Sequence, residues 1–240
     1  MTAHIVRLGD VGSTNDEARA RFTGAPLWVT AERQTAGRGR RGRPWVSDRG
    51  NLYASHAFSC TWPAPIVGLL PLAAALALAD AIAERGGTPA LKWPNDVLLA
   101  GKKVSGILIE TAFVGAARTT VIGFGVNIAS APPDVPATTL TAHTPATVDT
   151  LFAALAKHLP RRLLLLDAGD VAAVRAAWLK RAVGLGGPIT VRLETTTLEG
   201  TFEGLDDQGR LVLRQGEGTR HIAAGDVFLR TPAPADTAPR

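Results

Sequence analysis

Cysteine is nearly absent from this sequence of 240 residues, because Cys60 is its single cysteine. One cysteine excludes an intramolecular disulfide and a metal centre held by several thiolates. The first residues, Met1–His4, show no basic segment leading into an apolar run, so no signal peptide is predicted. These absences favour a reducing compartment, and we expect a cytoplasmic location.

A membrane-spanning run is also missing. The most apolar stretch covers residues 66–79, contains Pro71 and is followed by Asp80. A helix that spans a bilayer needs about 20 apolar residues in a row. We therefore predict a buried helix over residues 65–85 and no association with a membrane.

Net charge is small outside one short segment. The chain carries 26 lysine and arginine residues against 21 acidic ones, a formal net charge of +5. Between Arg33 and Arg49, six arginines face the single acid Asp48, so this segment alone carries +5 and the rest of the chain is neutral. A broad basic surface for nucleic acid is therefore not indicated.

Strand-like and helix-like patterns alternate along the chain and predict an α+β fold with a mixed central sheet flanked by helices. Hydrophobic residues make up 46% of the chain, which excludes disorder for most of it. Ser13 or Thr14 has a side chain able to cap a helix. Strands are expected over residues 5–8, 27–30, 52–58, 90–93, 103–113 and 119–127, and two further helices between 148 and 180.

The chain changes character near residue 187. Short alternating runs over 189–193, 198–204 and 210–214, with a turn at Asp206–Gly209, predict a small β domain. A stretch rich in proline, threonine and alanine, 130–148, predicts a long surface loop. We divide the chain into a domain over 1–186, a β domain over 187–231 and a disordered tail over 232–240.

The segment Gly37–Trp45 alternates glycine and arginine. Guanidinium groups match the oxygens of phosphates and carboxylates, and glycines let backbone amides approach an anion. We expect the segment to be mobile without a ligand and to order around an anion. Considered alone, it is equally consistent with a solvated charge run, an RNA-binding patch or a site for a small phosphate ligand.

Lysine is rare, with five residues against 21 arginines, and three of the five lie in two short motifs. Lys92–Asp96 places a cation, an amide and a carboxylate within five residues, and Asp96 could bind Mg²⁺ together with phosphate oxygens. The alternative is a turn in which Asn95 and Asp96 bond their own backbone. Lys103 begins a strand, where it either projects into a pocket or is an exposed turn lysine. The glycines of Gly123–Asn127 indicate close approach or, alternatively, a bulge.

In this order, the motifs resemble those of the biotin protein ligase family. The resemblance rests on Ser13–Asn15, Gln34, Gly37–Trp45, Lys92–Asp96, Lys103–Glu110 and Gly123–Asn127. It implies the biotin/lipoate ligase fold, similar to class II synthetases, followed by a small SH3-like barrel. It also implies an enzyme that activates biotin with ATP to biotinyl-5′-AMP, with Mg²⁺ as cofactor. Biotin is then transferred to a lysine of the biotin carboxyl carrier domain of an acetyl-CoA, related acyl-CoA or pyruvate carboxylase.

The resemblance also assigns roles to individual residues. Catalytic roles fall to Lys103, Arg40, Lys92 and Asp96, with Asp96 also the magnesium ligand. Biotin would contact Ser13, Thr14, Asn15, Gln34, Arg38, Gly39, Arg40 and Lys103. The nucleotide would contact Gly37, Arg38, Trp45, Asn95 and Asn127. Residues 130–140 resemble a second ligand-ordered loop of the family.

Several alternatives remain open at this point. Lipoate–protein ligase shares the fold and performs parallel chemistry, although Gly37–Trp45 favours biotin. An RNA-binding protein that uses this arginine-rich loop is the non-enzyme alternative. The motifs begin close to Met1, so we expect no helix-turn-helix domain and no DNA binding. We also expect a monomer or a weak homodimer.

Overall fold

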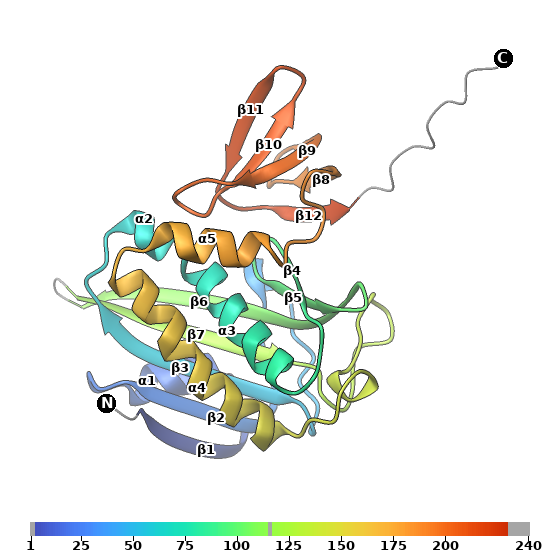
Figure 1. Cartoon of the computed structure of the whole chain (residues 1–240). Helices are drawn as coiled ribbons and strands as arrows, with labels where there is room; N and C mark the ends of the chain where they lie inside the picture. Colours follow the sequence, from blue (N-terminus) through green and yellow to red (C-terminus); the bar gives the residue numbers. More distant parts are fainter. Residues whose placement is uncertain (1–2, 115–116, 230–240) are drawn as a thin grey trace.

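A seven-stranded mixed sheet forms the centre of the molecule in the computed structural model, which describes residues 3–114 and 117–229 (Figure 1). The strand order is β1-β2-β3-β7-β6-β5-β4, and only β1 and β2 run parallel among the neighbouring pairs. The strands are β1 (His4–Val11), β2 (Leu27–Gln34), β3 (Leu52–Cys60), β4 (Ala90–Lys92), β5 (Asp96–Leu99), β6 (Lys102–Val114) and β7 (Ala117–Val126). The six predicted strands are present, and the four-residue β5 is an addition.

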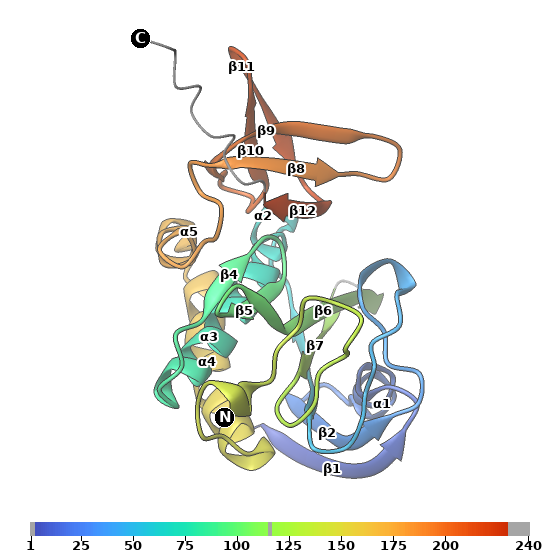
Figure 2. The same cartoon turned by 90° about the vertical axis from the view of Figure 1, so that its right-hand side faces the viewer.

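Helices cover both faces of this sheet (Figures 1 and 2). On one face lie α3 (Leu70–Glu84) and α4 (Val148–Asp167), with α5 (Val171–Leu179) beside them. On the other face α1 (Thr14–Arg21) packs over a small cluster that includes Ala18, Val29 and Val121. This second face, with α1 at one end, is the one that carries the candidate site.

The most apolar stretch of the chain is buried between the sheet and α4. The segment Ala64–Glu84 meets the length and hydropathy criteria of a membrane span, and 67% of its most apolar window is buried in this fold. The expected single helix is two helices, α2 (Ala64–Val67) and α3. The reason is that Pro71 lies in the first turn of α3, where its missing N–H is tolerated.

A second sheet of five antiparallel strands, ordered β11-β10-β9-β8-β12, follows α5. Its strands are β8 (Pro188–Arg192), β9 (Thr197–Leu205), β10 (Leu211–Gln215), β11 (Gly218–Ile222) and β12 (Asp226–Leu229). The predicted turn joins β9 to β10, with Gly209 at φ 73°. Strands β11 and β12 were not predicted individually, and the tail predicted over 232–240 lies outside the described residues.

The segment predicted as a surface loop is only partly exposed. It contains a 3-10 helix, Leu140–Ala142, and the side chain of Leu140 is fully buried. The backbone of this segment also flanks the site lysine, because Lys103 N donates to Pro136 O and Thr138 N donates to Lys103 O. The loop is therefore anchored in the core and attached to the start of β6.

Candidate active site

A cavity of about 430 Å³ lies on the α1 face of the large sheet, and residues of the second sheet also line it. Its walls come from α1, the Gly37–Trp45 loop, β6, β7, the loop before α4, and strands β8 and β12. Thirteen of the fourteen predicted site residues line it: Ser13, Thr14, Asn15, Gln34, Arg38, Gly39, Arg40, Trp45, Lys92, Asn95, Asp96, Lys103 and Asn127. The exception is Gly37, where a Cβ would overlap Ser47 and Trp45.

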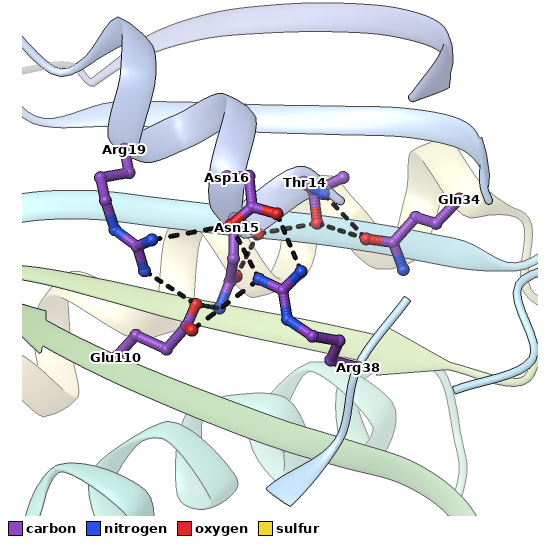
Figure 3. A network of polar contacts seen from close by, with 8 residues as sticks. Thr14, Asn15, Asp16, Arg19, Gln34, Arg38 and Glu110 are labelled. Carbon is purple, nitrogen blue, oxygen red and sulfur yellow. Dashed lines mark hydrogen bonds and ion pairs between the residues drawn. The ribbon is translucent and has the colours of Figure 1, made fainter. Parts of the chain in front are cut away.

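One end of the cavity is lined by uncharged hydrogen-bonding side chains, which connect to one another and to the carboxylate of Glu110 (Figure 3). Gln34 Oε1 accepts from the Thr14 backbone N–H at 2.8 Å and from the Thr14 hydroxyl at 3.0 Å. The Ser55 hydroxyl lies 2.8 Å from Thr14 Oγ1 and 2.7 Å from Asn15 Oδ1. Asn15 Nδ2 then donates to Glu110 Oε2 at 2.7 Å. These groups hold each other in fixed orientations, which suits recognition of a small polar ring.

The expected capping of α1 by Ser13 or Thr14 is wrong. Ser13 occupies the N-cap position, but its side chain makes no capping hydrogen bond. The side-chain oxygen Oε1 of Gln34, twenty residues away, accepts from the first backbone N–H of the helix instead. A free N-terminal amide needs an acceptor, and here the tertiary structure supplies it.

Two glycines of β7 make room for the side chains above the sheet. A Cβ at Gly123 would overlap the side-chain amide of Asn15, and a Cβ at Gly125 would overlap the indole of Trp45. Strand β7 keeps an unbroken register with both neighbours through these positions. The bulge alternative is therefore wrong, and close approach of side chains is the reason for these glycines.

The Gly37–Trp45 segment forms a small hairpin over the cavity. Gly39 N donates to Arg43 O at 2.7 Å and Trp45 N donates to Gly37 O at 2.9 Å. The hairpin is tied at both sides, because Arg38 pairs with Asp16 of α1 while Arg43 pairs with Asp226 of β12. These carboxylates compensate much of the positive charge that the sequence concentrates here, which weakens the RNA-binding alternative.

The other end of the cavity is basic. Lys103 Nζ lies 2.6 Å from Asp96 Oδ1, and Lys92 Nζ lies 4.0 Å from the same carboxylate. The turn alternative for Asn95 is wrong, because Asn95 Nδ2 donates to Ile107 O at 2.6 Å rather than to its own backbone. Lys103 projects into the cavity beside β6, so the exposed-turn alternative for this lysine is wrong as well.

Family models match most of this architecture. The biotin/lipoate A/B protein ligase family matches residues 9–127, and the biotin protein ligase C terminal domain matches residues 184–230. The chain is 40% identical over 238 residues to a biotin--[acetyl-CoA-carboxylase] ligase of Paracoccus denitrificans, covering 92% of this chain and 99% of that one. The chain belongs to the biotin protein ligase family. The resemblance drawn from its motifs is confirmed.

Two further comparisons agree with this family membership. A biotin--[acetyl-CoA-carboxylase] ligase of Mycobacterium tuberculosis is 35% identical over 237 residues, covering 92% of this chain and 86% of the relative. The structure of the biotin protein ligase from Aquifex aeolicus in complex with biotin and ATP superposes with a TM-score of 0.78 at 27% identity, covering 95% and 98% of the two chains. The predicted α+β fold, with a mixed sheet and an additional C-terminal β domain, is confirmed.

In this member of the biotin protein ligase family, the indole of Trp45 packs closely over Gly106 of β6 and Gly125 of β7. Lys103 Nζ sits 5.5 Å from its ring centroid, within range of a cation–π interaction. Its Nε1 is buried and has no hydrogen-bond partner within the described chain. The same atom is the one that a Cβ at Gly125 would overlap, so this unpaired donor faces the backbone of β7.

Sequence reasoning missed the contribution of the C-terminal β domain. Arg40 Nη1 donates to Gly225 O at 3.1 Å, and its guanidinium lies 4.0 Å from Asp226. Burial lowers the pKa of Arg40, and the neighbouring Asp226 opposes this shift. Phe228, also on the cavity wall, has the cations of Arg192 and Lys92 within 4.7 Å and 5.9 Å of its ring centroid. No local pattern marks these residues, because the contacts of Arg40 span 185 positions of the sequence.

Proposed function

We propose that this chain is a biotin–protein ligase, an enzyme that forms a carbon–nitrogen bond in two steps. In the first step the carboxylate of biotin attacks the α-phosphate of ATP, giving biotinyl-5′-AMP and releasing diphosphate. In the second step the ε-amine of a lysine attacks the acyl carbon and AMP leaves. The acceptor is the biotin carboxyl carrier domain of a biotin-dependent carboxylase.

The observation that carries this proposal is the polarity of the cavity. Its neutral end, with Thr14, Asn15 and Gln34, offers donors and acceptors that suit the ureido group of biotin. Its basic end, with Lys103 and Arg40, suits the reacting carboxylate and phosphate. A molecule with a polar ring at one end and a carboxylate at the other therefore matches both ends.

The roles at the basic end follow from charge. Two anions must meet in the first step, and positioned cations reduce their repulsion and stabilise charge on the transferring phosphorus. Lys103 supplies a compact ammonium for the carboxyl and phosphate oxygens, and Arg40 a forked donor beside it. The loop over the cavity limits the access of water to the mixed anhydride. Lys92, Asn95, Trp45 and Asn127 would border the nucleotide.

A magnesium ion held by the protein does not fit the groups present. Two carboxylates line the cavity, and both are already paired: Asp96 with Lys103 and Lys92, and Asp226 with Arg40 and Arg43. No group of three or more histidine, cysteine, aspartate or glutamate residues in the part of the chain described here could hold a metal. Mg²⁺ binds mainly through phosphate oxygens when carboxylates are few, so it would have to arrive with the nucleotide. Asp96 is better suited to orienting Lys103.

Lipoate is the poorer substrate on physical grounds. Its dithiolane ring has no hydrogen-bond donor and cannot use the hydrogen-bonding capacity that Thr14 and Asn15 keep beyond their bonds within the protein. A site built for hydrogen bonding rejects such an analogue strongly, because each buried unpaired group costs about 1–3 kcal/mol. Cytoplasmic location, absence of DNA binding and the oligomeric state stay predictions.

The test is a reconstituted reaction. Purified protein is incubated with biotin, ATP, MgCl₂ and a carrier domain that a reference ligase is known to modify. We expect one biotin on one carrier lysine, seen as a mass shift and mapped by peptide sequencing, with AMP and diphosphate as products. Lipoate in place of biotin serves as the specificity control. Absence of transfer to an active carrier would overturn the proposal.

A further inference from the structure

Arg38 is the loop arginine nearest to α1, and both of its terminal nitrogens are already occupied (Figure 3). Nη1 donates to Asp16 Oδ2 at 2.9 Å, and Nη2 donates to Asp16 Oδ1 at 2.7 Å. Nη2 also lies 3.9 Å from Glu110 Oε1. A two-pronged bond between guanidinium and carboxylate fixes orientation as well as distance. This guanidinium therefore fastens the loop to the helix, although the family resemblance assigns Arg38 to the ligand.

A second arginine competes for the same two carboxylates. Arg19, one turn further along α1, places Nη1 3.6 Å from Asp16 Oδ1 and Nη2 3.1 Å from Glu110 Oε2. Figure 3 shows the two guanidinium groups on either side of the acid pair. If the loop leaves, Arg38 leaves with it, whereas Arg19 stays on the helix. Asp16 and Glu110 therefore have a cationic partner whether the loop is closed or open.

We infer that Asp16, Glu110 and Arg19 form an exchange latch that sets how readily the Gly37–Trp45 loop opens and closes. Asp16 is a positioning residue that favours the closed loop, and Arg19 is a positioning residue that favours opening. Arg19 does so because it compensates the acid pair once Arg38 has gone. The inference rests on the proposed function only where it concerns the bound adenylate.

The electrostatics agree with this geometry. The hydrogen bond from Arg38 lowers the pKa of Asp16, and the same bond raises the pKa of Arg38. The four side chains keep between 27% and 46% of their surface exposed, so each pair is accessible to water and exchangeable. Pairs of this kind have small net energies, which suits a latch that must open in each catalytic cycle.

Limited trypsin digestion of the ligand-free enzyme measures the latch without any catalysis. Arg38, Arg40 and Arg41 are cleavage sites within the loop, and the new termini are counted by mass spectrometry. We expect Asp16→Asn to increase the loop cleavage rate about two- to fivefold and Arg19→Gln to decrease it by a similar factor, in line with the modest energies of exposed ion pairs. Glu17→Gln is the matched control, because Glu17 lies on α1 but pairs with Arg21, away from the loop.

A second measurement uses the bound adenylate. Release of biotinyl-5′-AMP in a chase experiment should be faster in Asp16→Asn and slower in Arg19→Gln, while Asp16→Glu retains partial closure. Salt at 0.5 M should bring the release rates of both variants closer to the wild-type rate, because salt screens the ion pairs. Melting temperatures near that of the wild type exclude a folding defect. Cleavage rates that match Glu17→Gln, or that move in the same direction in Asp16→Asn and Arg19→Gln, would overturn the latch even where the ligase reaction is found.

Discussion

Gln34 acts as the N-terminal cap of α1, since its Oε1 accepts from the backbone N–H of Thr14 at 2.8 Å. The same side chain donates through Nε2 to Ser47 Oγ at 3.0 Å, which ties the helix to the end of the arginine-rich loop. A polar side chain at the end of β2 thus connects two walls of the cavity. Removal of this side chain should affect both walls at once.

This connection predicts that substitution of the N-cap residue Ser13 destabilises the protein less than substitution of the distant Gln34. Ser13→Ala should cost less than about 0.5 kcal/mol in the free energy of unfolding, because Ser13 makes no capping bond, although N-cap serines are typically worth about 1 kcal/mol. Gln34→Ala should cost about 1–3 kcal/mol, because it leaves the Thr14 amide without its acceptor. Urea unfolding of both variants checks this. An order opposite to this one would show that Gln34 is not the cap.

The glycines of β7 give a second prediction. Gly123→Ala should destabilise the protein by about 1–3 kcal/mol, because the added methyl group displaces Asn15 from its bonds to Ser55 and Glu110. Biotin affinity should fall more than about tenfold, since 1.4 kcal/mol corresponds to a factor of ten. Gly9→Ala on β1 is the matched control, because no atom lies within 4 Å of its added Cβ. Calorimetric titration with biotin and thermal unfolding measure the two effects. Equal behaviour of the two variants would contradict the role given to Gly123.

Lys103 gives a third prediction. Lys103→Ala should reduce the rate of adenylate formation by about 10²-fold or more, as found when a group that stabilises developing charge is removed. The exposed neighbour Lys102 provides the control, and Lys102→Ala should keep nearly the full rate. Exchange of labelled diphosphate into ATP, which depends on biotin, measures the first step alone. A Lys103→Ala enzyme of normal stability and full exchange rate would refute the assignment.

A fourth prediction concerns pH and His56. Its ring is buried between Trp28 and Phe58, with Nδ1 3.2 Å from the carbonyl oxygen of Leu27, and burial lowers the pKa of His56 from 6.5 to about 4. Between pH 6.5 and about pH 4, His56 is protonated in the unfolded chain but not in the folded chain, so the free energy of unfolding falls as pH falls. We expect a loss of about 2 kcal/mol between pH 7 and pH 5, because one pKa unit corresponds to about 1.36 kcal/mol.

Denaturant unfolding at the two pH values checks this loss, and a His56→Gln variant should lose less between them. The lowered carboxyl pKa values of Glu84 and Asp206, each about 2, stabilise the fold above their ordinary values of 4.5 and 3.8, and this stabilisation is lost only at lower pH. The window between pH 5 and pH 7 therefore lies above the range in which these two carboxyl groups act. An unchanged slope in His56→Gln would show that another group carries the effect.

Much of the fold was determined by local pattern. Alternating and β-branched runs marked β3, β6 and β7, because these strands are long enough to show a period. The very short β5 has four residues and no such period. The break between α2 and α3 falls just before Pro71. From the sequence alone, a proline in the first turn of a helix cannot be distinguished from a proline in a helix interior.

The sequence by itself determined which residues make up the site. Residue types at fixed spacings identified the family motifs, and the count of charges placed the excess positive charge on one loop. Such features depend on neighbours along the chain, and a single sequence records them directly.

What only the tertiary structure decided is the partner of each group. Gln34 caps a helix, Gly123 makes room for Asn15, Arg38 fastens to Asp16, and Asp226 joins the site from the far end of the chain. The physical reason is that hydrogen bonds and ion pairs act over about 3–4 Å in space, whereas these partners lie from twenty to more than a hundred positions apart in sequence. Folding of the large sheet with α1 brings the first three pairs within that distance, the second sheet brings Asp226 there, and no local pattern encodes either.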